Sequence, residues 1–69
     1  MKHKVGDLVV LCDVSNRLKG PKYHLGYISN VRPPDNYYIY FFNMEKEIWY
    51  SEHYVDAFKQ TLKDMVKNE

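Results

Sequence analysis

The sequence lacks the features of disulfide-stabilised, membrane-spanning and secreted proteins. Its 69 residues contain one cysteine, Cys12, which excludes an internal disulfide framework. No apolar run is long enough to span a bilayer, and Asp7 and Asp13 bracket an apolar stretch that is too short for a signal peptide. We therefore expect no membrane contact and a reducing cytoplasmic setting, which is the host cytoplasm if the protein is viral.

The residue patterns of catalysis and metal binding are also missing. The sequence has no glycine-rich phosphate loop and no paired carboxylates for acid–base chemistry. Cys12 ends an apolar segment, where we expect a small buried side chain and not a nucleophile. His3, His24 and His53 are widely spaced and lack the further ligands that a metal site needs. We predict no enzyme, no metal and no cofactor.

Aromatic residues are abundant. They make up 16% of the chain, with seven tyrosines, three phenylalanines and one tryptophan. Such side chains bury a large area per ordered residue, which suits the core of one small domain spanning residues 1–69. The net charge is only +1, but residues 1–32 hold six lysines and arginines against two aspartates. The N-terminal half is therefore basic.

Four segments rich in β-branched and aromatic residues are predicted as strands: 8–12, 25–32, 37–42 and 47–50. Gly26 indicates a bulge or a close backbone approach. Turns at 33–36 and 43–46 join the last three strands into an antiparallel meander. Between the first two strands, residues 13–24 form a long loop with Gly20 and Pro21 near its apex.

The C-terminal segment has a helical pattern. No glycine or proline follows residue 34, and Ser51 is placed to cap a helix. The helix is predicted over about 52–67, because apolar residues recur there at helical spacing: Val55, Phe58, Leu62, Met65 and Val66.

Several segments resemble those of SH3-like modules. Val5-Gly6-Asp7-Leu8-Val9 resembles the opening of KOW, Tudor and related modules, where the Gly-Asp pair turns the chain into the first strand. Gly26-Tyr27-Ile28 and Tyr38-Ile39-Tyr40-Phe41 resemble their second and third strands. Glu47-Ile48-Trp49-Tyr50-Ser51-Glu52 is similar to the fourth, especially in short proteins of tailed bacteriophages. The resemblance implies a mainly β fold, a small SH3-like antiparallel barrel over about residues 4–51. The C-terminal α-helix would replace or cover the closing strand.

The aromatic strand offers two faces. Along 37–42, Tyr38, Tyr40 and Phe42 share one face, and Tyr37, Ile39 and Phe41 share the other. One face must build the core, and the second is then aromatic as well. This second face is either exposed, as a platform that docks a partner or stacks bases, or covered by the helix. We expect the helix to cover it, because helix and sheet each need an apolar partner.

If that second face is a protein-binding surface, its candidate residues are Tyr27, Tyr38, Tyr40, Trp49 and Tyr50. A different surface follows from the basic loop. Arg17, Lys19 and Lys22, together with the adjacent Tyr23 and with Arg32 further along the chain, are candidates for contact with nucleic acid. The alternative for this loop is a solvated segment with no ligand.

These features predict a non-enzymatic binding module with a protein partner, and by the phage resemblance an adaptor or inhibitor that binds a host protein. The alternative is an SH3-like (KOW- or Tudor-like) domain that contacts DNA or RNA phosphates through the 17–24 loop. The near-neutral charge favours a protein partner, because nucleic-acid modules usually carry more positive charge. Self-association as a homodimer is compatible with either function.

Overall fold

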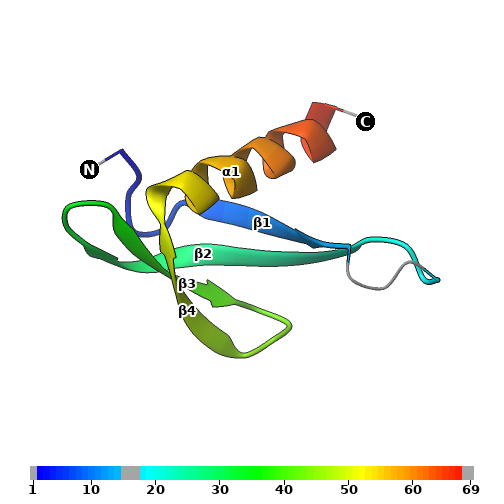
Figure 1. The fold of residues 1–69 in the computed structure, drawn as a ribbon, viewed down its shortest axis with the longest axis horizontal. Coiled ribbons are helices and arrows are strands. Elements are labelled where there is room, and N and C mark those ends of the chain that lie inside the picture. Colours follow the sequence, from blue (N-terminus) through cyan, green and yellow to red (C-terminus); the bar gives the residue numbers. More distant parts are fainter. Residues whose placement is uncertain (1, 15–17, 68–69) are drawn as a thin grey trace.

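The computed structural model describes residues 2–14 and 18–67. It consists of four antiparallel strands followed by one helix (Figure 1). Among the described residues, no helix has both the length and the apolar character needed to cross a membrane. The mainly β architecture with a C-terminal helix is confirmed. Its elements are β1 (Leu8–Asp13), β2 (Lys22–Arg32), β3 (Asn36–Phe41), β4 (Lys46–Ser51) and α1 (Glu52–Lys67).

The sheet is open. Its strands lie in the order β1-β2-β3-β4, so each strand pairs with its neighbour in the sequence. Within the described part of the chain no ladder joins β1 to β4, and the barrel closure that the resemblance implied is not found there. The helix lies along the sheet instead and packs mainly against β1 (Figure 1). A helix in this position buries its apolar stripe and one sheet face at the same time.

The second strand is longer than its sequence indicates. It begins at Lys22, so Lys22, Tyr23 and His24 belong to β2 and not to the loop. They pair with the last three residues of β1, from Leu11 to Asp13. Their sequence has weak strand character, but the ladder to β1 supplies the backbone partners that hold them extended. The connection between the two strands shrinks to residues 14–21.

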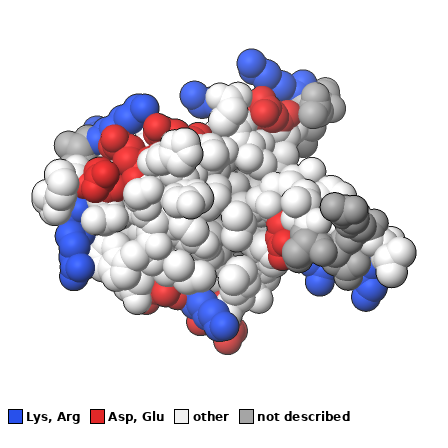
Figure 2. Space-filling model, viewed as in Figure 1, with Lys and Arg blue, Asp and Glu red and all other residues white. Residues whose placement is uncertain are grey.

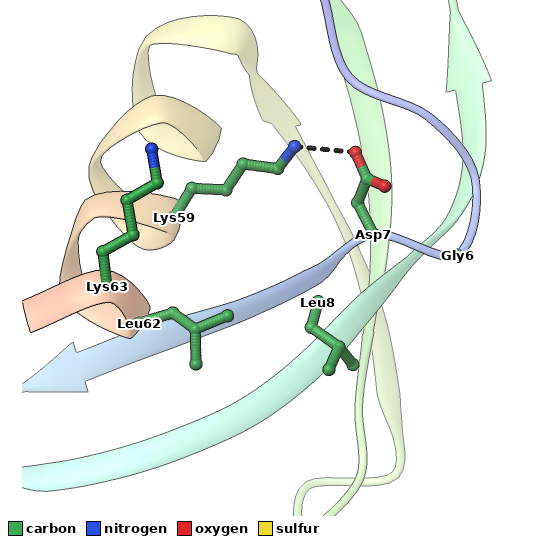
Figure 3. A pocket seen from close by; sticks show the side chains of 6 residues that line it. All are labelled: Gly6, Asp7, Leu8, Lys59, Leu62 and Lys63. Atoms are coloured by element: carbon green, nitrogen blue, oxygen red, sulfur yellow. Dashed lines mark hydrogen bonds and ion pairs between the residues drawn. The ribbon is translucent and has the colours of Figure 1, made fainter. Parts of the chain in front are cut away.

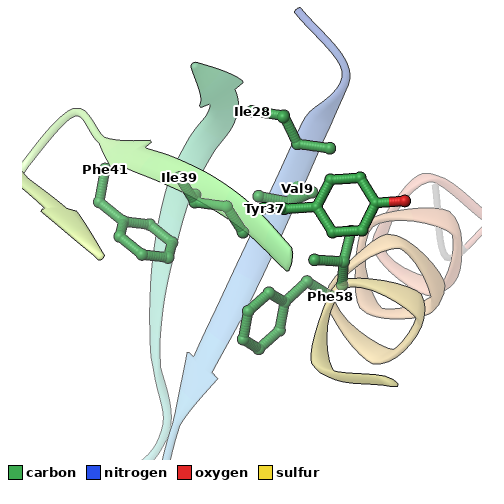
Figure 4. Packing of buried hydrophobic residues seen from close by; sticks show 7 residues of the cluster. Val9, Ile28, Tyr37, Ile39, Phe41 and Phe58 are labelled. Atoms are coloured by element: carbon green, nitrogen blue, oxygen red, sulfur yellow. The ribbon is translucent and has the colours of Figure 1, made fainter. Parts of the chain in front are cut away.

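The core lies between one face of the sheet and α1 (Figure 4). It follows from the alternation of β3, in which Tyr37, Ile39 and Phe41 all point toward the helix and are fully buried. The helix contributes side chains from its first two turns. The cluster consists of Val9, Ile28, Tyr37, Ile39, Phe41, Val55 and Phe58.

Two backbone details shape β2. A Cβ atom at Gly26 would lie 2.6 Å from the Tyr40 carbonyl oxygen and 2.8 Å from Phe41 Cδ1, so the expected close approach is confirmed. The irregularity in the ladder lies further along, between Ile28 and Asn30. A bulge adds one residue to a strand and shifts the alternation of the side chains that follow.

The turn into β1 forms at the predicted Gly-Asp pair. Gly6 has φ of +96°, a conformation that glycine adopts at little cost. Its N–H donates to the Ile28 carbonyl at 2.8 Å, and the Ile28 N–H donates to the Asp7 carbonyl at 3.0 Å. The turn therefore ties the N-terminal arm, residues 2–7, to the middle of β2.

Candidate functional site

The helix leaves the other side of the sheet uncovered. Residues directly opposite in an antiparallel ladder share a face, so the pairs Leu8–Tyr27, Tyr27–Tyr40 and Tyr38–Trp49 all point away from the core. Phe42 joins them through its contacts with Tyr27 and Tyr40. We call this surface the open face and define it by Leu8, Leu25, Tyr27, Arg32, Tyr38, Tyr40, Phe42, Glu47 and Trp49.

Aromatic rings on the open face form two clusters. The ring centroids of Tyr27, Tyr40 and Phe42 lie 5.5 to 5.9 Å apart. Tyr38 and Trp49 stack nearly parallel, with centroids 4.4 Å apart and planes at 17°. Such ring–ring contacts stabilise the arrangement of these side chains. Substantial apolar area stays accessible, since Phe42 is 50% and Trp49 39% exposed.

The open face carries little charge. In the four strands, all of whose residues the structure describes, the positions on this face include one cation, Arg32, and one anion, Glu47. The Arg32 guanidinium carbon lies 4.8 Å from the centre of the Trp49 ring, within the range of a cation–π interaction. Glu47 Oε2 accepts a hydrogen bond of 2.9 Å from the Ser29 hydroxyl. In the view of Figure 2, most charged side chains lie around the outline of the molecule.

Two sequence-based expectations about this face were wrong. The helix was expected to cover the second aromatic face, but Phe58 packs with Tyr37, Ile39 and Phe41, on the face that builds the core. Tyr50 was grouped with the exposed aromatics. It points to the helix instead, where its ring lies edge-on to Phe58 with centroids 4.9 Å apart. The alternation of β4, in which Trp49 and Tyr50 must face opposite sides, is the signal that assigns Tyr50 correctly.

The remaining predicted residues, Tyr27, Tyr38, Tyr40 and Trp49, are brought together on the open face. Leu8, Leu25 and Phe42 belong to this surface as well and were absent from the predicted set. Their exposed fractions are 49%, 44% and 50%. Alternation alone places Phe42 with Tyr38 and Tyr40. Leu8 and Leu25 require the β1–β2 pairing as well, and the register of that pair depends on tertiary contacts.

The proposed phosphate-contacting residues do not form one cluster. Arg17 lies outside the described residues. Lys19 is exposed in the connection, and Lys22 and Tyr23 begin β2. Arg32 ends the same strand, and ten residue steps of about 3.3 Å place it roughly 33 Å from Lys22. Tyr23 pairs with Cys12 and shares the side of Leu25 and Tyr27, so it borders the open face.

A second polar region joins the N-terminal arm to α1. Asp56 on the helix pairs with His3 and Lys2. Its Oδ1 lies 2.7 Å from His3 Nε2, and its Oδ2 lies 3.2 Å from Lys2 Nζ. Lys59 Nζ lies 2.6 Å from Asp7 Oδ2 (Figure 3). We call these five residues the N-terminal latch. The hydrogen bond from Lys59 lowers the pKa of Asp7, and the bond with His3, followed by that from Lys2, lowers the pKa of Asp56.

Buried Tyr37 connects the latch to the core. Its hydroxyl accepts a hydrogen bond of 3.2 Å from the His3 backbone N–H and donates one of 3.0 Å to Glu52 Oε1. Burial raises the pKa of Tyr37. The His3 ring is 6% exposed and lies edge-on to the Tyr37 ring, with centroids 5.2 Å apart. The latch therefore holds both the arm and the first turn of α1 on the core.

Two shallow cavities flank the latch. One of about 370 Å³ is lined by Leu8 and Leu62 together with latch residues (Figure 3), and the other, of about 270 Å³, lies beside His3 and Asp56. Lys59 and Lys63 line both. Because Asp7 already pairs with Lys59 and Asp56 with the arm, most of the charge that would attract a ligand is neutralised. These cavities are better explained as consequences of the latch.

Metal-type clusters are not found in residues 2–14 and 18–67, where no three His, Cys, Asp or Glu side chains converge. Cys12 is a half-buried free thiol. The open face is thus the feature of the described structure with the strongest claim to a binding function. Comparisons of the chain with protein families, with curated proteins and with solved structures found no match.

Proposed function

We propose that this protein is a non-enzymatic protein-binding module whose docking surface is the open face. The observation that carries the proposal is an aromatic sheet face that α1 leaves uncovered. A contiguous exposed apolar surface typically marks an interaction site. Tyrosine and tryptophan are enriched among the residues that dominate binding energy, and charged residues are depleted at the centres of interfaces. The open face has both properties.

The charge of this face favours a protein over a nucleic acid. Arg32 and Glu47 cancel, whereas surfaces that bind single-stranded nucleic acid combine aromatic rings with a positively charged groove. Lys19 in the connection and Lys22 lie at one end of β2, and Arg32 lies at the other. A nucleic-acid backbone would have to reach both across a neutral surface.

The resemblance to short phage proteins supports a narrower version of the proposal, in which the partner is a bacterial host protein and this protein is an adaptor or inhibitor. The same resemblance supports an SH3-like origin of the fold, with α1 in place of the closing strand. The element order agrees with both ideas: a first strand, a connection, a three-strand meander and a final segment against β1.

The test measures affinity for a captured partner in matched variants. A partner is isolated from bacterial lysate with the tagged protein, and its affinity is then measured by calorimetry for Trp49→Ala, Tyr40→Ala and Tyr54→Ala. Tyr54 is a control because it is an exposed tyrosine on α1, away from the open face. We expect Trp49→Ala to weaken binding by about 30-fold, as for an interface hot spot of about 2 kcal/mol.

Tyr40→Ala is expected to weaken binding clearly, while Tyr54→Ala stays within about 3-fold of the unaltered protein. Equal affinities for all three variants would contradict the open face as the docking surface. Binding of DNA or RNA that weakens steeply with salt, and that is insensitive to Trp49→Ala, would favour the nucleic-acid function instead.

A further inference from the structure

The two charged residues of the open face lie on a diagonal of the sheet. Arg32 on β2 is opposite Asn36 of β3, and Glu47 on β4 is opposite Tyr40 of β3. Tyr38 lies midway between Asn36 and Tyr40, on the strand between β2 and β4. The backbone positions of the cation and the anion are therefore on opposite sides of Tyr38, which is stacked on Trp49.

This arrangement is self-complementary. In a two-fold dimer the same patch is used by both copies, and residue i of one copy meets residue j of the other while j meets i. The two-fold axis of such a dimer would lie in the plane of contact. If it passes over Tyr38 and is perpendicular to the Arg32–Glu47 diagonal, Arg32 of each copy lies opposite Glu47 of the other. In forming these two pairs, Arg32 leaves the Trp49 ring that it now covers and Glu47 leaves the Ser29 hydroxyl, which exposes the aromatic stack at the centre of the contact.

We infer that a second copy of this chain occupies the open face when no other protein does. The inference shares its surface with the proposed function, but it does not require that another partner exists. Burial of the exposed parts of Phe42, Trp49, Leu8 and Leu25 provides the driving force. The two Arg–Glu pairs fix the orientation, because charge complementarity mainly determines specificity.

The size of the face sets the expected stability of the dimer. Four strands about 4.8 Å apart and six residues of about 3.3 Å each give a surface of roughly 20 by 20 Å. This is smaller than the roughly 800 Å² per partner of a standard stable interface. We therefore expect a dimer that dissociates on dilution, leaving the face available to another protein.

Sedimentation of charge-reversed variants tests the inference. The unaltered protein should shift from 8.3 kDa toward twice that mass as its concentration rises. Arg32→Glu and Glu47→Arg should each remain at the monomer mass, because each places like charges opposite one another. An equimolar mixture of the two should regain the shift. In a mixed dimer the glutamate introduced into one copy faces the arginine introduced into the other, and the second charge pair keeps its original residues.

A matched control and a folding check accompany these variants. Lys63→Glu, a charge reversal on the exposed side of α1, should dimerise like the unaltered protein. Circular dichroism of both open-face variants establishes that they are folded, so that a lost shift reports the contact.

Each result decides between distinct outcomes. A monomer at all concentrations, dimerisation of both single variants, or a mixture that stays monomeric would overturn the inference. If the protein stays monomeric but the proposed function is correct, Trp49→Ala still weakens partner binding more than Tyr54→Ala does. If only the proposed function fails, the recovery in the mixture still occurs.

Discussion

Both faces of the sheet carry aromatic residues, but the two faces have opposite surroundings. On β3, Tyr37, Ile39 and Phe41 are 0% exposed beneath α1, whereas Tyr38 and Tyr40 are only half-buried on the other side. Both faces contain rings in contact with one another. Composition therefore does not distinguish core from surface in this strand. The position of the helix does.

One helix has one apolar stripe and can cover one face only. Here it covers the face where Tyr37 has partners for its hydroxyl, His3 on the arm and Glu52 on α1. A buried hydroxyl without such partners would cost free energy, so the latch and the covered face belong together. The open face lacks this support from the arm, and its tyrosines remain partly exposed to solvent.

The largest expected difference in the free energy of unfolding is between two variants that each truncate one ring, one on each face. Phe41→Ala should lower the free energy of unfolding by about 3–5 kcal/mol, because it leaves a cavity in the core. Tyr40→Ala, on the preceding residue, should cost clearly less, about 1 kcal/mol, because its ring is partly exposed and lies outside the core cluster. Urea unfolding of both variants measures the difference.

Ile39→Val is a milder probe of the covered face, suited to a small domain with little stability to lose. It should lower the free energy of unfolding by about 0.5–1.5 kcal/mol, because it removes one buried methyl group. Similar effects of Phe41→Ala and Tyr40→Ala, or no effect of Ile39→Val, would show that the two faces are not distinct in solution.

Removing one hydroxyl is expected to lower the free energy of unfolding by less than Phe41→Ala does. Tyr37→Phe keeps the ring in the core but leaves the His3 N–H and Glu52 without their partner. An unsatisfied buried donor costs free energy, and we expect a loss of about 1–2 kcal/mol in urea unfolding. Tyr54→Phe, on an exposed tyrosine, is the matched control and should be neutral. Equal stabilities of the two variants would exclude a role for the Tyr37 hydroxyl in holding the arm and α1 on the covered face.

The smallest expected effect is the acid response of the latch. The pKa values of Asp7 and Asp56 are lowered in the folded protein, mainly by Lys59 and His3 respectively. A lowered pKa gives stability that is present above the unfolded value of about 3.9 and is lost as the pH falls through the folded value. We therefore expect the free energy of unfolding to fall as the pH drops from about 5 to 3.

Asp56→Asn should make this decline shallower and should also lower stability at neutral pH. Asp64→Asn is the control, because Asp64 lies on the same helix and its carboxylate accepts a hydrogen bond from the uncharged Gln60 amide. Urea unfolding at several pH values compares the two. A decline that is as steep in Asp56→Asn as in Asp64→Asn would show that the latch aspartates do not contribute to the acid response.

Much of the local structure could be predicted from the sequence. The helix bounds agree with the predicted range, and the four strands lie where β-branched and aromatic residues cluster. These features depend on neighbours only a few residues apart, and periodicity is visible in the sequence. The close approach at Gly26 was predicted on similar local grounds, since a glycine within a strand often marks a place where another backbone comes near.

The candidate site was predicted in part. Alternation along 37–42 separated Tyr38 and Tyr40 from Tyr37 and Phe41, as the structure has them. The same rule applied to β4 would have removed Tyr50 from the exposed set. No such rule predicts the early start of β2, because Lys22 and Tyr23 are held extended by β1.

The sequence by itself thus determined that this protein has an aromatic strand with two apolar faces and one amphipathic helix. Only the tertiary structure decided which face the helix covers. That choice depends on contacts between distant residues, such as the His3–Asp56 bond across 53 positions and the Lys59–Asp7 pair across 52. Local patterns carry no information about such contacts, because their free energy exists only once the chain has folded.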